Sequence, residues 1–226
     1  MQECSLAAND LACRRGDRLL FRGLSLRLGA GGAVQLIGSN GIGKSSLIRI
    51  LAGLMPAFAG QVERNGTVAL LDERPALDPH LPLGRALGFW QQIDGPEDNQ
   101  VARLGLAALM DVPVRYLSTG QKKRAALARL LGQRAPIWLL DEPLNGLDTK
   151  GVELVETLAA EHCHGGGICV IASHQPFRLE PMERLSLAAF TPPPLGEGSG
   201  GGGTAFDQSS HGAPLPNPSP PGEGHL

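Results

Sequence analysis

The sequence predicts an α/β protein built on a mainly parallel sheet that helices cover on both faces. Three short, almost wholly apolar segments have the composition of buried strands, namely residues 33–37, 137–140 and 168–172. Two other segments place their apolar side chains on one helical face, at positions 47, 48, 50, 51 and 54 and at positions 152, 155, 158 and 159. Strands that alternate with helices at this spacing form parallel sheets with both faces buried.

The segment before residue 32 predicts a different, antiparallel arrangement of short strands and turns. Gly16-Asp17 is a typical hairpin turn, and residues 24–28 alternate apolar with polar side chains. A further short strand is expected over residues 67–71. Up to about residue 32, then, the sequence predicts short strands and turns.

Composition divides the chain at about residue 190. Of the last 36 residues, 191–226, 8 are Pro and 9 are Gly, and none is Lys or Arg. A segment with so few apolar side chains cannot offset the entropy lost on ordering, so we predict that this tail is disordered. Residues 1–190 have the composition of one folded domain, and interrupted helical patterns predict a small helical subdomain over about residues 84–131.

The charge balance and the lack of long apolar runs exclude several classes of protein. The chain has 20 basic and 22 acidic residues, for a formal net charge of −2. A dedicated nucleic-acid-binding protein usually has a strong basic excess, so we expect no direct nucleic-acid partner. No apolar run approaches the roughly 20 residues that cross a bilayer, and the N-terminal segment lacks the apolar stretch of a secretory signal.

Four cysteines are too few for a disulfide scaffold, and we expect reduced thiols. The cluster His162-Cys163-His164, with Cys169 beyond it, contains residue types that bind metals. It has no CxxC or CxxCH spacing, and Cys169 lies in a strand-like apolar run. We therefore favour ordinary thiols over a metal or haem site.

A glycine-rich loop joins the strand over residues 33–37 to the following helix. It matches GxxxxGK[ST] and consists of Gly38, Ser39, Asn40, Gly41, Ile42, Gly43, Lys44, Ser45 and Ser46. Glycines let successive backbone N–H groups point at phosphate oxygens, and the dipole of the helix favours the same anion. Lys44 is expected to reach the β- and γ-phosphates and the Ser45 hydroxyl to bind Mg²⁺, so the loop predicts a nucleoside triphosphate site.

Two carboxylates, Asp141 and Glu142, follow the apolar strand over residues 137–140. Beside the phosphate loop, Asp141 is placed to hold Mg²⁺ directly or through water, and Glu142 to act as the general base for an attacking water. Two acids after a strand usually mark a solvated loop, but the phosphate loop roughly 100 residues upstream favours a catalytic pair.

A second loop before a helix, Leu117-Ser118-Thr119-Gly120-Gln121, closely resembles the LSGGQ signature of ATP-binding-cassette (ABC) proteins. At a helix N-terminus, Ser118 and the backbone N–H groups near Gly120 can bind phosphate with the help of the helix dipole. Further motifs follow in the order of that family: Asp141-Glu142-Pro143, the D-loop residues Leu147-Asp148, and His174 at the end of a strand.

The resemblance to ABC ATPases covers residues 5 to about 190. It implies a P-loop NTPase fold with a RecA-like core, an N-terminal antiparallel β subdomain and a small helical signature subdomain. It also implies ATP and Mg²⁺ as cofactors, with His174 contacting the γ-phosphate. Because the signature loop lies far from the phosphate loop of its own domain, it implies a head-to-tail homodimer in which Ser118 and Gly120 act on ATP held by the second copy.

Within that family, the chain most resembles the ATPases of the cytochrome c maturation system, the haem exporter ATP-binding proteins. The stretches that support this narrower resemblance are residues 13–28, 47–62 and 136–176, and the short folded part fits that compact subgroup. The resemblance implies haem handling driven together with integral membrane permease subunits. It implies a peripheral position at the cytoplasmic face of the bacterial inner membrane.

The sequence departs from the family pattern at three places. Arg15 stands where many ABC ATPases have a tyrosine that stacks on adenine, and a guanidinium plane can also stack on a purine. Glu73-Arg74 replaces the segment that carries the Q-loop glutamine, and a cation cannot bind Mg²⁺. Two interpretations stay open: Glu73 or Asp72 supplies the oxygen, or coupling to the membrane subunit is weakened in this protein. Thr119 replaces the first signature glycine, a smaller change.

Two other functions remain open on the sequence. The chain could be the ATPase subunit of a different importer or exporter, or a soluble ABC protein of translation or DNA repair. The second class usually has two cassettes or a long coiled-coil insertion, and this sequence has neither. A non-enzymatic regulatory cassette is disfavoured because Glu142 and His174 are both present.

Overall fold

A five-stranded parallel sheet forms the centre of the protein in the computed structural model, which describes residues 4–95 and 100–192. Its strands lie in the order β5-β6-β7-β3-β8, and every neighbouring pair is parallel. The strands are β3 (Ala33–Ile37), β5 (Val68–Leu71), β6 (Ile137–Asp141), β7 (Ile168–Ala172) and β8 (Glu183–Ser186). The predicted parallel sheet is therefore confirmed. The tail predicted to be disordered lies outside the described residues except for Thr191 and Pro192.

Both faces of this sheet are buried, which explains why its inner strands are apolar throughout. All five residues of β6 are buried, and so are all five of β7. Along β6, Ile137 and Leu139 join one hydrophobic core, while Trp138 and Leu140 join the other. This alternation is the period of two that a strand imposes on its side chains. The residues of the edge strand β8 are exposed or half-buried and mostly polar, so the sequence of β8 does not indicate a strand.

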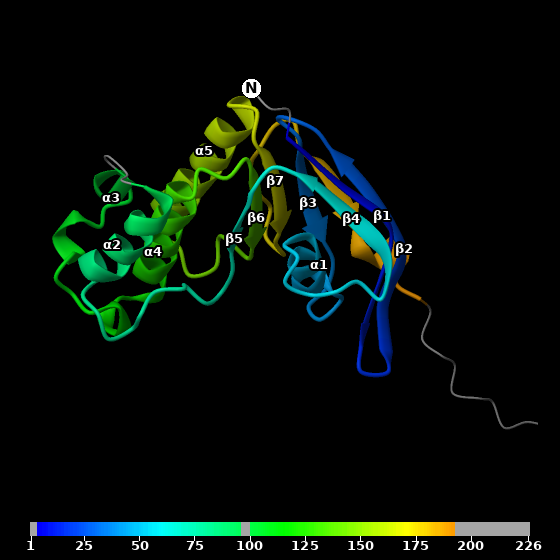
Figure 1. Ribbon diagram of the computed structural model, residues 1–226, viewed down its shortest axis with the longest axis horizontal. Helices are drawn as coiled ribbons and strands as arrows, with labels where there is room; N and C mark the ends of the chain where they lie inside the picture. Colours follow the sequence, from blue (N-terminus) through cyan, green and yellow to red (C-terminus); the bar gives the residue numbers. More distant parts are fainter. Residues whose placement is uncertain (1–3, 96–99, 193–226) are drawn as a thin grey trace, which may run out of the picture. The chain divides into compact units, whose positions relative to one another are not determined.

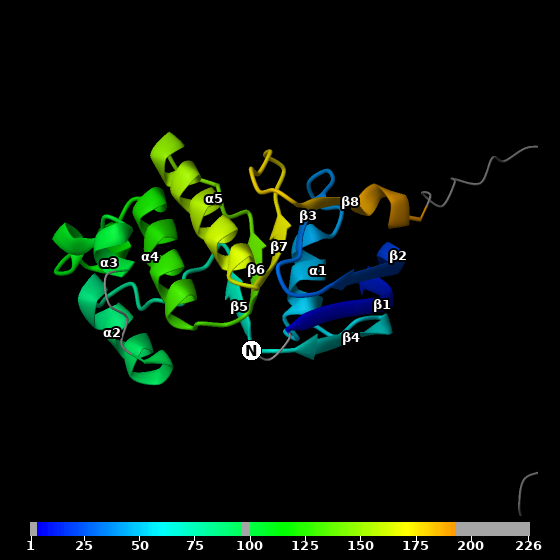
Figure 2. The ribbon, with the colours of Figure 1, turned by 90° about the horizontal axis from the view of Figure 1, so that it is seen from above.

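One core lies between the parallel sheet, helix α1 (Lys44–Leu51) and a second, antiparallel sheet (Figures 1 and 2). That sheet has the order β2-β1-β4, from β1 (Ser5–Arg15), β2 (Arg18–Leu28) and β4 (Ala59–Asn65). Gly16-Asp17 joins β1 to β2, as the hairpin signal predicted. The two strands have 11 residues each rather than being short, and β4 was not predicted because six of its seven residues are exposed.

The prediction of which side chains are buried along α1 is correct except at its last position, residue 54. Leu47, Ile48, Ile50 and Leu51 are buried, whereas Leu54 is 69% exposed. The helix ends at Leu51, with Ala52 as its C-cap, so Leu54 lies beyond the helical turn that would have directed its side chain inward.

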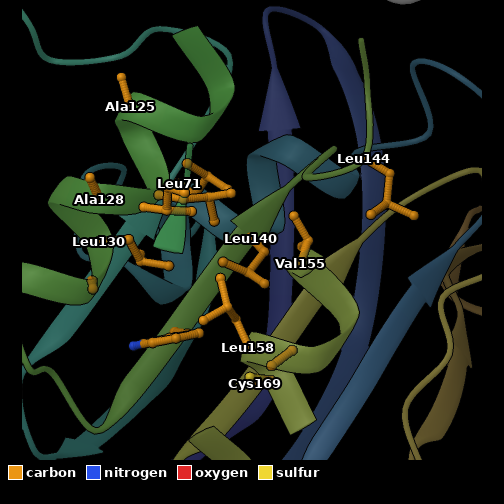
Figure 3. Close-up of a cluster of buried hydrophobic side chains, with 14 of the residues drawn as sticks. Leu71, Ala125, Ala128, Leu130, Leu140, Leu144, Val155, Leu158 and Cys169 are labelled. Carbon is orange, nitrogen blue, oxygen red and sulfur yellow. The ribbon is translucent and has the colours of Figure 1, made fainter. Parts of the chain in front are cut away.

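Helices cover the other face of the parallel sheet. α4 (Thr119–Gly132) and α5 (Thr149–His164) pack their leucine, valine and alanine side chains against β5, β6 and β7, as Figure 3 shows for Ala125, Ala128 and Leu158. Beside α4 lie α2 (Leu83–Asp94), α3 (Gln100–Arg103) and the 3₁₀ turns η1 (Ala107–Leu109) and η2 (Val114–Tyr116); η3 (Leu187–Phe190) follows β8. Within residues 84–95 and 100–131, the segment expected to be helical in pieces does consist of separate helices and turns.

Candidate nucleotide-binding site

A cavity of about 750 Å³ opens at the carboxyl ends of the parallel strands. β3, β5, β6 and β7 end beside it, which is where ligands bind in open α/β sheets. Among the residues proposed from the sequence, those that line the cavity are Arg15, Asn40, Gly41, Gly43, Lys44, Ser45, Ser46, Asp141, Glu142 and His174. Gly38, Ser39 and Ile42 belong to the same loop. The fold thus brings the phosphate loop and the two acidic residues together.

The phosphate loop adopts a backbone that glycine favours. Gly38, Gly41 and Gly43 have φ angles of 149°, 76° and 119°, in the region that L residues with side chains rarely adopt. A Cβ atom on Gly43 would lie 3.2 Å from the Phe21 ring. Gly43 is also the N-cap of α1 and provides no side-chain hydrogen bond, so the first N–H groups of this helix remain available to an anion.

The Lys44 ammonium is folded back onto this loop. It is 6% exposed, and its Nζ donates hydrogen bonds to the carbonyl oxygens of Gly38 at 2.7 Å and Ser39 at 3.4 Å. Ile42 N–H donates to the same Ser39 carbonyl at 3.3 Å, which closes the loop. An ammonium held against the glycine-rich loop is suited to binding phosphate oxygens there.

Ser45 and Asp141 bring two oxygen ligands together. The Ser45 hydroxyl donates to Asp141 Oδ1 at 3.1 Å, and Asp141 is 4% exposed. Burial raises the pKa of Asp141; the Ser45 hydrogen bond opposes this rise, and the charges of Glu142 and Glu73 add to it. A hydroxyl and a buried carboxylate at this separation are a donor set that fits a divalent cation such as Mg²⁺.

Glu142 and His174 form the second pair in the cavity. His174 Nδ1 and Glu142 Oε2 lie 2.9 Å apart, although 32 residues separate them in the chain. The Glu142 side chain is 14% exposed, and that of His174 is 48% exposed. Glu142 has φ of 47°, a strained conformation for a residue with a side chain. The carboxylate is thereby held at the strand end with one oxygen committed to the imidazole.

The segment after β5, where the expected glutamine is missing, also reaches the cavity. Asp72, Glu73 and Arg74 all line it, and Asp72 Oδ1 accepts a hydrogen bond from the backbone N–H of Arg74 at 2.9 Å. This Asx turn holds the segment compact without using the side chains of Glu73 or Arg74. Both of those side chains are therefore free to face a ligand.

The signature loop lies elsewhere. Ser118 is the N-cap of α4, is exposed and is outside the set of residues that line the cavity. Gly120 packs against the loop after β6, where an added Cβ would lie 2.8 Å from the carbonyl oxygen of Gly146. Within one chain, then, the signature loop does not line the cavity that the phosphate loop lines.

Several residues of the cavity were not proposed from the sequence. Arg18 lies opposite Arg15 across the β1–β2 hairpin, and Arg49 and Asn145 also line the cavity. The hairpin register would have indicated Arg18, because residues 15 and 18 flank a two-residue turn. No short-range pattern marks Arg49 or Asn145.

Among the described residues, no group of three or more His, Cys, Asp or Glu side chains could hold a metal. His162 stacks on Trp138, with ring centroids 3.9 Å apart, and burial lowers its pKa. The four cysteines are free and buried. Within residues 4–95 and 100–192, no helix is long and apolar enough to span a membrane.

A glycine-rich phosphate loop beside a strand that ends in two carboxylates defines a P-loop nucleotide hydrolase. The sequence profile described as "ABC transporter" matches residues 21–145. Cytochrome c biogenesis ATP-binding export protein CcmA of Novosphingobium aromaticivorans is 61% identical over 192 residues, which cover 85% of this chain and all of the relative. The protein of the same name from Zymomonas mobilis is 50% identical, with 82% of this chain and 85% of the relative covered.

Solved structures agree on the fold. A putative metal-chelate type ABC transporter in an inward-facing conformation has a TM-score of 0.69 at 21% identity, covering 81% of this chain and 80% of that one. The cbiO1 protein of Clostridium perfringens has a TM-score of 0.61 at 24% identity, covering 75% and 78%. The chain belongs to the ABC transporter family, in the group of the cytochrome c biogenesis ATP-binding export proteins. It is an ATP-hydrolysing subunit of a transporter.

Proposed function

We propose that this ATPase powers an export step of cytochrome c biogenesis, with haem or its periplasmic chaperone as the cargo that is handled. Two observations support the proposal. One is the similarity to relatives named for this process, at 61% and 50% identity. The other is that Lys44, Glu142 and His174 line one cavity. The main support for the hydrolytic step is that the pair formed by Glu142 and His174 lies in the same cavity as the pair formed by Ser45 and Asp141.

ATP would bind with its phosphates on the loop from Gly38 to Ser46. The backbone N–H groups at the start of α1 would donate to the phosphate oxygens, and Lys44 would exchange its contacts with the Gly38 and Ser39 carbonyls for the β- and γ-phosphates. Arg15, exposed at the rim of the cavity, would stack its guanidinium on the adenine ring.

Mg²⁺ would be held by the Ser45 hydroxyl and by Asp141, directly or through water. When bound, the cation neutralises charge on the phosphate oxygens. Glu142 would take a proton from the attacking water, and His174 would orient the Glu142 carboxylate while contacting the γ-phosphate. The 14% exposure of Glu142 keeps this carboxylate in reach of water and shields it from bulk solvent.

A head-to-tail homodimer would complete each site. Ser118 and Gly120 lie outside the cavity of their own chain, so they can contact only nucleotide held by a second copy. Integral membrane permease subunits would bind the same dimer and receive its conformational change. This assembly would place the chain at the cytoplasmic face of the bacterial inner membrane, with no direct nucleic-acid partner.

The test is Glu142→Gln, because the amide keeps the size and hydrogen bonding of the carboxylate but cannot act as a base. We expect ATP binding to remain, hydrolysis to slow by roughly 100-fold or more, and an ATP-bound dimer to accumulate in size-exclusion chromatography. Near-normal turnover, measured with the membrane subunits present, would refute the assignment of Glu142.

A further inference from the structure

Lys123 is a buried cation on the first turns of the signature helix α4. Lys123 is 8% exposed, and its Nζ donates a hydrogen bond to the backbone carbonyl oxygen of Glu142 at 3.1 Å. A lysine is rarely buried to this degree unless a partner compensates the lost hydration of its charge. The compensation here comes from the strand end that carries the hydrolytic residues.

The charges around Lys123 are acidic. Burial lowers the pKa of Lys123, and the carboxylates of Glu73, Asp141, Asp72 and Glu142 oppose this change. These four acids are the ones that line the nucleotide cavity. The ammonium therefore lies behind the acidic side of the cavity and lowers the electrostatic cost of gathering four carboxylates there.

The backbone of Glu142 needs support because its φ of 47° is unfavourable for a residue with a side chain. Its N–H donates to the Ala172 carbonyl oxygen at 2.8 Å, and its own carbonyl oxygen accepts from Lys123 Nζ and, at 3.4 Å, from Asn145 N–H. Strand β7 thus holds one side of this peptide and helix α4 holds the other. The direction of the Glu142 carboxylate depends on both.

Helix α4 is itself firmly placed. Ala125 and Ala128 pack in the core between α4 and the sheet (Figure 3), and Gly120 packs against the carbonyl oxygen of Gly146 in the loop that follows Glu142. Lys123 lies one helical turn after Gly120. The ammonium is therefore a fixed link between the signature turn and the strand end that carries Glu142.

We infer that Lys123 is a positioning residue for ATP hydrolysis: its ammonium holds the Glu142 carbonyl and so aims the Glu142 carboxylate from the signature helix. The inference rests on the proposed role of Glu142 as the general base. Lys123 is not among the residues that line the nucleotide cavity, so we expect it to affect the rate of hydrolysis rather than ATP affinity.

The test compares three variants of the full chain, co-purified with its membrane subunits. Lys123→Met removes the ammonium and keeps the length of the side chain. We expect kcat to fall by about 10-fold, the effect of losing one hydrogen bond from a charged donor, while the Kd for ATP stays within about twofold. Lys123→Arg keeps a charged donor and should recover most of the lost kcat.

Lys122→Met is the matched control. Lys122 is the neighbouring residue on the same helix, but its Nζ donates to the carbonyl oxygen of Arg115 rather than to Glu142. The same substitution there should leave kcat unchanged. If Lys123 had only a structural role, Lys123→Met would lose kcat and ATP affinity equally, or Lys123→Arg would fail to recover kcat. Either result would overturn the inference.

Glu142→Gln, assayed beside these variants, separates the two proposals. An inactive Glu142→Gln together with a Lys123→Met variant of normal kcat would refute the role of Lys123 and leave the proposed function standing. An active Glu142→Gln would refute Glu142 as the base, which is the part of the proposed function on which the role of Lys123 depends.

Discussion

The helices that follow the phosphate loop and the signature loop begin in opposite ways. α1 begins after Gly43, which has φ of 119° and offers no side-chain cap to the first N–H groups. α4 begins after Ser118, whose hydroxyl accepts from Gln121 N–H at 3.2 Å while the Gln121 side chain accepts from Ser118 N–H at 2.8 Å. This reciprocal pair is a capping box.

This difference determines whether the backbone N–H groups at the start of each helix are available to bind an anion. At α1 no side chain caps the first N–H groups, so these donors are available to an anion before nucleotide arrives. At α4 the donors of Ser118 and Gln121 already have partners, and the turn is stable without a ligand. In the proposed head-to-tail dimer, phosphate held by a second copy would therefore compete with the capping box at α4.

The largest effect is expected from a substitution at the start of α1. Lys44→Met removes the only side-chain cation of the phosphate loop, and we expect ATP affinity to fall by roughly 100-fold, as for the loss of a charged hydrogen bond to phosphate. Isothermal titration with ATP measures the change. An unchanged Kd would mean that the backbone N–H groups alone bind the phosphates.

The next largest effect is expected from a substitution at the start of α4. Ser118→Ala should leave the Kd for ATP of the single chain within about twofold and lower the ATPase rate of the assembled dimer by about 10-fold. The comparison of affinity with rate is the informative one, because Ser118 is outside the cavity of its own chain. A large loss of affinity in the monomer would contradict this separation.

A smaller effect is expected at the segment after β5, where this chain lacks the glutamine of its family. Glu73 lies in the cavity and near Asp141, so Glu73→Ala should weaken Mg²⁺-dependent turnover by several-fold. Arg74→Gln should preserve or raise turnover, because a guanidinium has donors only and cannot bind the metal.

Steady-state rates measured across a Mg²⁺ titration compare these two variants directly. The reverse ranking, with Arg74→Gln inactive and Glu73→Ala normal, would show that Arg74 itself acts on the phosphate.

The smallest expected effect is on stability. Gln121→Ala breaks one half of the capping box at α4, and the free energy of unfolding should fall by about 1 kcal/mol. The Tm should decrease by roughly 2–4 °C for a domain of this size, which calorimetry can measure. ATP affinity should not change. Glu153→Ala, on an exposed turn of α5, is a control that should leave the Tm nearly unchanged.

Motifs within short stretches were readable from the sequence alone. The phosphate loop, Asp141-Glu142, the signature loop and the inner strands of the sheet all follow from residue type at close spacing. The apolar runs over 137–140 and 168–172 indicate burial on both faces of a parallel sheet. The capping box was implicit in the same way, because Ser118 and Gln121 are three residues apart.

Other features depended on the packing of distant segments. β4 and β8 are edge strands with exposed, polar side chains, so only pairing with β1 and β3 defines them. The approach of Lys123 to Glu142 crosses 19 residues, and its burial follows from the way α4 packs on the sheet. A lysine after a signature motif has no local pattern that distinguishes a solvated side chain from a buried one. Tertiary structure decided that difference, because burial is a property of what the rest of the chain places around a residue.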